Sequence, residues 1–232
     1  MIQLSIPDTF LALVPLLPVL IIFVYLKLNS RELMIAIARM ALQLVMIGYA
    51  LNFLFSHNDP WLGIMILSFM LAISSTIVIR PVVNKDKSRY LRVLFSLGIA
   101  AMAVLIWVLK FVIELNPWYQ PSYVIPIAGM ILANGMTGLS ICAERIEKEL
   151  ARGTSRSEAN LEAFNAALIP QINSFLAVGL VALPGMMTGQ ILSGVSPLVA
   201  VRYQIMVMSM IMATTCISVA IYLWLEQRNQ LR

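Results

Sequence analysis

The chain has 232 residues, of which 60% are hydrophobic and only 12% are charged, whereas soluble domains contain about 25% charged residues. Its apolar residues fall in runs of about 20, which match the thickness of the hydrocarbon core of a bilayer and exclude an ordinary soluble enzyme. The net charge of +5 does not indicate nucleic-acid binding, because Lys and Arg occur in short clusters between the apolar runs.

Apolar segments long enough to cross a membrane as helices recur along the whole chain. They cover residues 9–26, 33–55, 61–79, 92–113, 123–143, 169–192 and 198–225. The first segment has no Lys or Arg before Lys27, unlike a cleaved signal peptide, so we expect it to remain as a span. We therefore predict an all-α, polytopic transmembrane helical bundle of about seven spans, forming a single domain over residues 1–232 with the lipid bilayer as its surroundings.

Most basic residues lie in alternate connections between these segments and at the C-terminus. The clusters are Lys27 and Arg31; Arg80, Lys85, Lys87, Arg89 and Arg92; Arg145, Lys148, Arg152 and Arg156; and Arg228 and Arg232. Basic loops remain on the cytoplasmic side of a membrane. With an odd number of spans, the N-terminus is then predicted outside and the C-terminus in the cytoplasm.

The connection over residues 144–165 is longer and more charged than the others. Gly153 interrupts a helix-favouring stretch, and Ser155 followed by Glu158 is typical of a capping box that begins a new helix. We predict a helix, a break at Gly153, and a short cytoplasmic helix that leads back into the bilayer. The alternative interpretation is a solvated linker between two spans.

Part of this connection resembles the EAA-x-x-x-G loop with which many ABC permeases dock on their ATPase. Glu147 and Gly153 match it, although Lys148 and Glu149 replace the two alanines and the Ile-Pro pair at 169–170 lies further downstream. The resemblance implies a coupling element. Its residues would be Glu147, Gly153, Ser155, Arg156 and Glu158. No P-loop is present in the sequence, so we expect no catalytic residue or cofactor in this chain and a partner subunit that binds ATP and Mg²⁺.

Longer motifs resemble the FetB/YbbM-like family of ABC transporter permeases. They are VIPIAGMILANGM at 124–136, AALIPQINS at 166–174, VGLVALPGMMTGQI at 178–191 and YQIMV at 203–207, with ARMALQLVMIGY at 38–49 as a weaker match. Bacterial members of that family are linked to iron export and plant relatives to aluminium tolerance. The resemblance implies export of iron or a related metal ion, a FetA-like ABC ATPase, a permease homodimer and a multi-pass location in the bacterial inner membrane.

Proline and glycine adjoin within several of the apolar segments. A helix broken at membrane depth frees backbone groups that need protein or water around them, and such breaks often form a transport path or hinge. The predicted hinge or gate residues are Pro126, Gly129, Pro170, Pro184 and Gly185. Close helix packing at Gly129 and Gly135, or at Gly185 and Gly189, is the alternative.

Polar and methionine side chains within the spans are candidates for contact with cargo. The path candidates are Met130, Asn134, Met186, Met187, Gln204, Met206 and Glu114. Each has another reading, since amides form hydrogen bonds between helices, Met fills gaps, and Glu114 is spaced to pair with Lys110. His57 with Asp59 provides too few ligands for a metal site.

Other functions remain open at this point. The same architecture can carry another small solute or a metal chelate, and an ATP-independent channel or carrier needs no partner ATPase. A membrane-embedded enzyme is disfavoured, because the sequence contains no catalytic dyad or ligand cluster.

Overall fold

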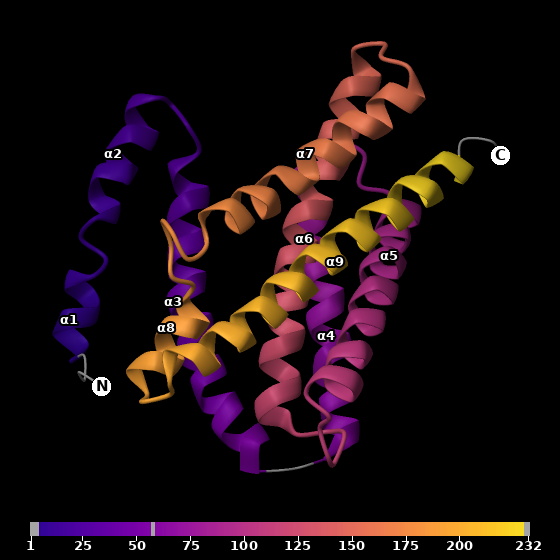
Figure 1. The fold of residues 1–232 in the computed structure, drawn as a ribbon. Helices are drawn as coiled ribbons and strands as arrows, with labels where there is room; N and C mark the ends of the chain where they lie inside the picture. Colours follow the sequence, from indigo (N-terminus) through magenta and orange to yellow (C-terminus); the bar gives the residue numbers. More distant parts are fainter. Residues whose placement is uncertain (1–4, 57–58, 230–232) are drawn as a thin grey trace. The chain divides into compact units, whose positions relative to one another are not determined.

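The computed structural model describes residues 5–56 and 59–229, which are nearly all helical (Figure 1). The chain divides into two units, Met1–His57 and Asn58–Arg232. The predicted all-α fold is confirmed. Within the described ranges, six helical stretches are long and apolar enough to cross a membrane.

The first unit contains α1 (Ile6–Leu11), α2 (Leu16–Tyr25) and α3 (Ser30–Ser56). Ser5 caps α1 in a capping box with Asp8, and a turn over residues 12–15 separates α1 from α2 within one apolar stretch. Lys27 takes a positive φ of 54°, which reverses the chain between α2 and α3. These helices correspond to the predicted spans 9–26 and 33–55.

In its described residues, the second unit contains four helical stretches that are long and apolar enough to cross a membrane, and two further helices. The long ones are α4 (Pro60–Val78), α5 (Lys87–Trp107) with its π-helical continuation η1 (Val108–Val112), α6 (Pro121–Ala151) and α9 (Pro197–Asn229); α7 (Arg156–Ala177) and α8 (Gly185–Leu192) lie between α6 and α9 in sequence. Asp59 and Asp86 cap α4 and α5. Both side chains accept a hydrogen bond from a backbone N–H of the first turn, which satisfies a donor that the helix leaves free.

The core of the second unit lies where α5, α6, α7 and α9 meet. Gly138 of α6 lies against Thr215 of α9 and the carbonyl of Ala167 on α7, and a side chain at Gly138 would overlap that threonine. Leu97 of α5 would be only 2.7 Å from a Cβ at Gly135. Small residues let helix backbones approach closely in membranes, so the packing reading of Gly135 is confirmed.

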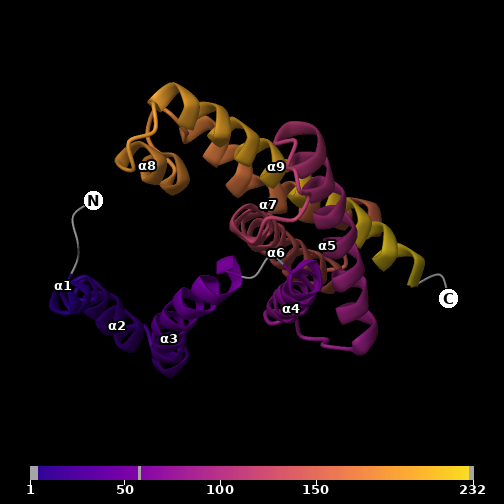
Figure 2. The ribbon, with the colours of Figure 1, turned by 90° about the horizontal axis from the view of Figure 1, so that it is seen from below.

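The segment 169–192 differs from the prediction of one continuous span. α7 begins at Arg156, passes through Pro170 and ends at Ala177, and α8 begins only at Gly185. Gln171 of α7 contacts Thr215 of α9. Measured from that contact, the part of α9 that runs back to its first residue, Pro197, is much longer than the part of α7 that runs on to its last residue, Ala177. The interruption therefore falls within the length of α9. α8 lies beside the start of α9 and away from α4 and α5 (Figure 2).

One end of the second unit gathers three of the predicted basic clusters. Arg89 at the start of α5, Glu147 near the end of α6 and Glu226 near the end of α9 are in contact there. The predicted topology requires the connections 79–86 and 152–155 and the end of α9 to lie on one side of the membrane, and these helix ends meet in the structure. The assignment of that side to the cytoplasm stays a prediction.

Candidate functional site

A tight hairpin joins α6 to α7 at the position of the predicted coupling element. Arg152 ends α6, Gly153 takes a φ of +82°, and Ser155 caps α7 by accepting from the N–H of Glu158 at 3.4 Å. The Ser155 hydroxyl also donates to the Glu158 carboxylate at 3.2 Å. The predicted break at Gly153 and the predicted helix start after Ser155 are therefore confirmed.

The returning helix α7 is one continuous helix and not a short helix followed by a separate span. It has 22 residues, which corresponds to about 33 Å. Ala159, Ala163 and Ala167 recur on one buried face, and their small side chains allow close approach to α6. Arg145 of α6 also reaches Glu162 of α7 at 3.5 Å. The hairpin thus packs along its length rather than only at its turn.

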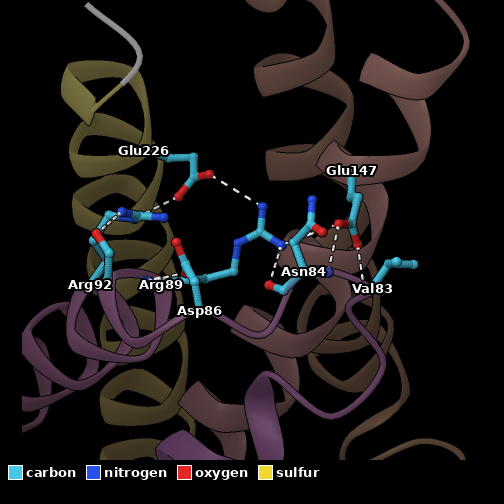
Figure 3. A network of polar contacts seen from close by, with 8 residues as sticks. Val83, Asn84, Asp86, Arg89, Arg92, Glu147 and Glu226 are labelled. Carbon is cyan, nitrogen blue, oxygen red and sulfur yellow. Dashed lines mark hydrogen bonds and ion pairs between the residues drawn. The ribbon is translucent and has the colours of Figure 1, made fainter. Parts of the chain in front are cut away.

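Behind the hairpin, Glu147 is engaged within the chain (Figure 3). Its carboxylate accepts hydrogen bonds from the backbone N–H groups of Val83 and Asn84 at 2.9 and 3.3 Å and from Arg89 at 3.2 Å. These bonds attach the end of α6 to the connection between α4 and α5. Glu147 therefore has a structural role here, whatever contacts it makes with a partner.

A second carboxylate extends this network to α9. Glu226 accepts from Arg92 Nε at 2.8 Å and from Arg89 at 3.4 Å, and its side chain is only 7% exposed. Arg92 also donates to Ser88 at 2.6 Å. A buried charge is tolerated when it is paired and hydrogen-bonded. We refer to Arg89, Arg92, Glu147 and Glu226 as the ion-pair network; it joins the ends of α5, α6 and α9.

The other predicted coupling residues lie at the hairpin turn. Gly153, Ser155 and Glu158 are exposed, so a partner can reach them. Arg156 is half-buried; its guanidinium nitrogens are shielded from solvent and have no hydrogen-bond partner among the residues described. The turn therefore presents an accessible tip next to a half-buried arginine.

The interruption between α7 and α8 frees backbone groups. Gly179 takes a φ of +82°, and the carbonyl of Ala177 accepts from the N–H groups of Leu180, Val181 and Ala182. Leu180 and Val181 are 89% and 85% exposed in this chain. Irregular backbone within a membrane is tolerated where protein or water covers it. This segment consequently needs a further surface or a water-filled path beside it.

The predicted hinge residues fall into two groups. Pro126 and Pro170 lie inside α6 and α7, which continue through them, while Pro184 is the N-cap of α8 and Gly185 its first residue. A Cβ at Gly129 would make only an ordinary contact of 3.5 Å with Met70, and one at Gly185 would meet no other described atom within 4 Å. Only the second group borders an actual break.

The predicted path residues are spread over several helices. Asn134 donates to the carbonyl of Met130 in its own helix at 2.9 Å. The buried side-chain oxygen of Gln204 has no partner in the described part of the chain. Glu114 follows η1 with a φ of +53°. The methionines Met130, Met186 and Met206 are partly buried against the core, and Met187 is half-buried.

No metal centre emerges among the residues that the structure describes, since none of their His, Cys, Asp and Glu side chains gather in groups of three. His57 lies outside the described residues. The sequence reasoning missed the ion-pair network, although its members are charged residues at helix ends. Their pairing depends on contacts as far as 137 residues apart, which spacing does not reveal.

Comparison with known proteins identifies the family. The model of the Uncharacterised protein family UPF0014 matches residues 6–231. A UPF0014 membrane protein of Synechocystis sp. is 35% identical, covering 82% of this chain and 79% of the relative. The Probable iron export permease protein FetB of Escherichia coli is 31% identical over 86% and 82%.

A plant protein is also related. Protein ALUMINUM SENSITIVE 3 of Arabidopsis thaliana is 31% identical, covering 81% of this chain and 72% of the relative. No solved structure matches the chain. The resemblance found in the sequence motifs is confirmed, and the chain is a multi-pass membrane protein that belongs to the UPF0014 family.

Proposed function

We propose that this chain is the membrane-spanning permease subunit of an ABC transporter that exports iron or a related metal ion across the bacterial inner membrane. A separate FetA-like subunit would bind and hydrolyse ATP, and two copies of the permease would form the membrane part. The relationship to a probable iron export permease supports the class of cargo. The hairpin between α6 and α7 supports coupling to a partner.

The observation that carries this proposal is the continuity of α7. Its first residue, Arg156, directly follows the exposed turn, and its last residue, Ala177, directly precedes the interrupted segment. A push on the turn would therefore move the interruption, because the two lie at the ends of one continuous, packed helix of about 33 Å. The sequence motif suggests a docking loop near residue 153, and the helix would connect that loop to the segment where we propose that a path opens.

The interrupted segment has the electrostatic character that a cation requires. The C-terminal end of a helix carries a partial negative charge, and unwound carbonyls often coordinate cations in transporters. The C-terminus of α7 is followed by carbonyl groups in a non-helical segment, and Met186 and Met187 begin the next helix. Thioether sulfur suits soft metal ions. We propose these groups as transient ligands of the cargo.

The test is co-purification of the full chain with its ATPase, followed by ATP hydrolysis with and without Fe(II). We expect a stable complex whose turnover rises with iron. A stable complex that is indifferent to Fe(II) would retain the ABC assignment and refute the cargo. Transport that continues without any ATPase would refute the ABC assignment in favour of a channel or carrier.

A matched pair of glycine variants tests the docking turn. Gly153 and Gly194 both take a positive φ, 82° and 92°, and a Cβ added at either glycine would meet no other described atom within 4 Å. Proline cannot adopt either conformation. We expect Gly153→Pro to abolish complex formation while Gly194→Pro retains it. Equal binding by both variants would refute the turn as the docking site.

A further inference from the structure

A cavity outside the coupling element lies between α4, α5 and the start of α6. Its volume is about 700 Å³, and its lining is mostly apolar, including Leu67 and Leu71 of α4 and Met102 and Leu105 of α5. A smaller cavity shares these four residues and extends along α5 to Gly98. Together they form one cleft, which we call the α4–α5 cleft.

The cleft has charged groups at one end only. Lys110, Glu114, Asn116 and Trp118 line that end, which is the end of α5 farther from the ion-pair network. Lys110 lies within the π-helix η1 and Glu114 has a positive φ, so the two residues lose the regular helical spacing that would pair them. In the described ranges neither has an ion-pair partner, contrary to the predicted pair.

The dimensions of the cleft match one leaflet of a bilayer. From Gly98 to Lys110 the rise of α5 is about 18 Å, and half of a hydrocarbon core is about 15 Å. Trp is enriched at the level of the lipid head groups, and a Lys near the end of a membrane helix extends its ammonium group to that level. The cleft thus presents apolar depth below a polar rim, as an amphipathic lipid requires.

We propose that the α4–α5 cleft binds a phospholipid with an amine in its head group, namely phosphatidylethanolamine. An acyl chain would occupy the apolar depth. The Lys110 ammonium would bind the phosphate, and the Glu114 carboxylate would bind the lipid ammonium. A metal ion is a poor occupant, because the apolar part of the cleft offers few oxygen or sulfur ligands. They are the thioether of Met102 and the hydroxyl of Ser68, and that hydroxyl already donates to the carbonyl of Ile64.

The experiment offers the full-length protein equal amounts of phosphatidylethanolamine and phosphatidylglycerol in detergent and counts retained lipids by native mass spectrometry. Both lipids carry a phosphate for Lys110, but only phosphatidylethanolamine carries an ammonium group that can form an ion pair with the Glu114 carboxylate. A partly exposed ion pair changes binding by up to about fivefold. We expect about that preference for the ethanolamine lipid in the wild type and about equal retention in Glu114→Gln.

Three further variants test the cleft itself. Leu67→Trp fills it, whereas Ile73→Trp adds the same side chain at an exposed position on α4 outside its lining. We expect the first to lose both lipids and the second to bind as the wild type. Lys110→Gln changes an exposed side chain and should weaken retention of both lipids even if Leu67→Trp does not fold.

The proposal is overturned if the wild type retains no lipid, if Glu114→Gln keeps the ethanolamine preference, or if Leu67→Trp retains as much lipid as Ile73→Trp. The measurement uses neither ATP nor metal ions. Its failure would therefore leave the proposed export function untouched.

Discussion

Glu226→Gln is the most informative single change in the second unit, because it removes the carboxylate that binds both arginines of the ion-pair network. Among the described residues, Arg92 would keep its bond to Ser88 and Arg89 would keep Glu147, and the glutamine oxygen could still accept one hydrogen bond from an arginine. Both guanidinium groups are 12% exposed or less. Removing one partner of a buried pair costs about 3–5 kcal/mol. We expect about 3 kcal/mol, since both arginines retain a polar partner.

Glu147→Gln is the matched control in the same network. This side chain is 21% exposed, the amide oxygen can still accept from the N–H of Val83 or Asn84, and Arg89 keeps Glu226. The expected loss of unfolding free energy is about 1 kcal/mol. The two isosteric changes should therefore differ by roughly threefold in their effect on stability.

Thermal unfolding in detergent measures the difference through Cys142, which is fully buried. In a Cys216→Ser background, a thiol-reactive dye reports exposure of Cys142 as the core opens. At 2–4 °C per kcal/mol for a chain of this size, Glu226→Gln should lower the Tm by roughly 6–12 °C and Glu147→Gln by about 2–4 °C. Equal shifts, or a larger shift for Glu147→Gln, would refute this account of the network.

Other expectations concern packing, coupling and pH. Gly138→Ala should lower the free energy of unfolding by about 1–3 kcal/mol, because the added methyl group overpacks against the threonine of α9. Gly189→Ala, in open space, should raise it by about 0.5–1 kcal/mol. The thermal unfolding midpoints of the two variants measure this difference. Ala163→Leu, on the buried face of α7, should reduce cargo-stimulated ATP hydrolysis more than Ala166→Leu does. Burial raises the pKa of Tyr119, so stability should fall as pH rises past about 10, and Tyr119→Phe should reduce the Tm loss between about pH 8 and pH 10.5.

The helices and the hairpin turn follow from local rules, which is why the sequence predicts them. Long apolar runs require helices in lipid, and a glycine followed by a serine cap ends one helix and begins the next. Gly153 and Ser155 accordingly take the predicted positions. The predicted segments 61–79 and 198–225 likewise match α4 and α9 to within a few residues.

The interruption between α7 and α8 escapes a hydropathy reading, because residues 178–184 are as apolar as their neighbours. The break arises from the positive φ of Gly179 and from Pro184. Pro184 has no backbone N–H, so it could not donate a hydrogen bond within a helix that continued from α7. Pro170 shows the converse, since α7 continues through it. A proline in a membrane helix is therefore an ambiguous signal until its neighbours are known.

The placement of Glu147 changes how the coupling hypothesis has to be tested. Because its carboxylate holds the connection between α4 and α5, reversing its charge would disturb the bundle even if it never contacts an ATPase. Loss of the complex in that variant would not separate docking from folding. Glu158 is exposed, and among the described residues its hydrogen bonds lie within its own cap. Glu158→Gln removes its charge but keeps a side-chain oxygen that can accept from the Ser155 hydroxyl, so it costs little stability. A loss of ATPase binding in Glu158→Gln, with an unchanged Tm, would therefore assign docking to the turn itself.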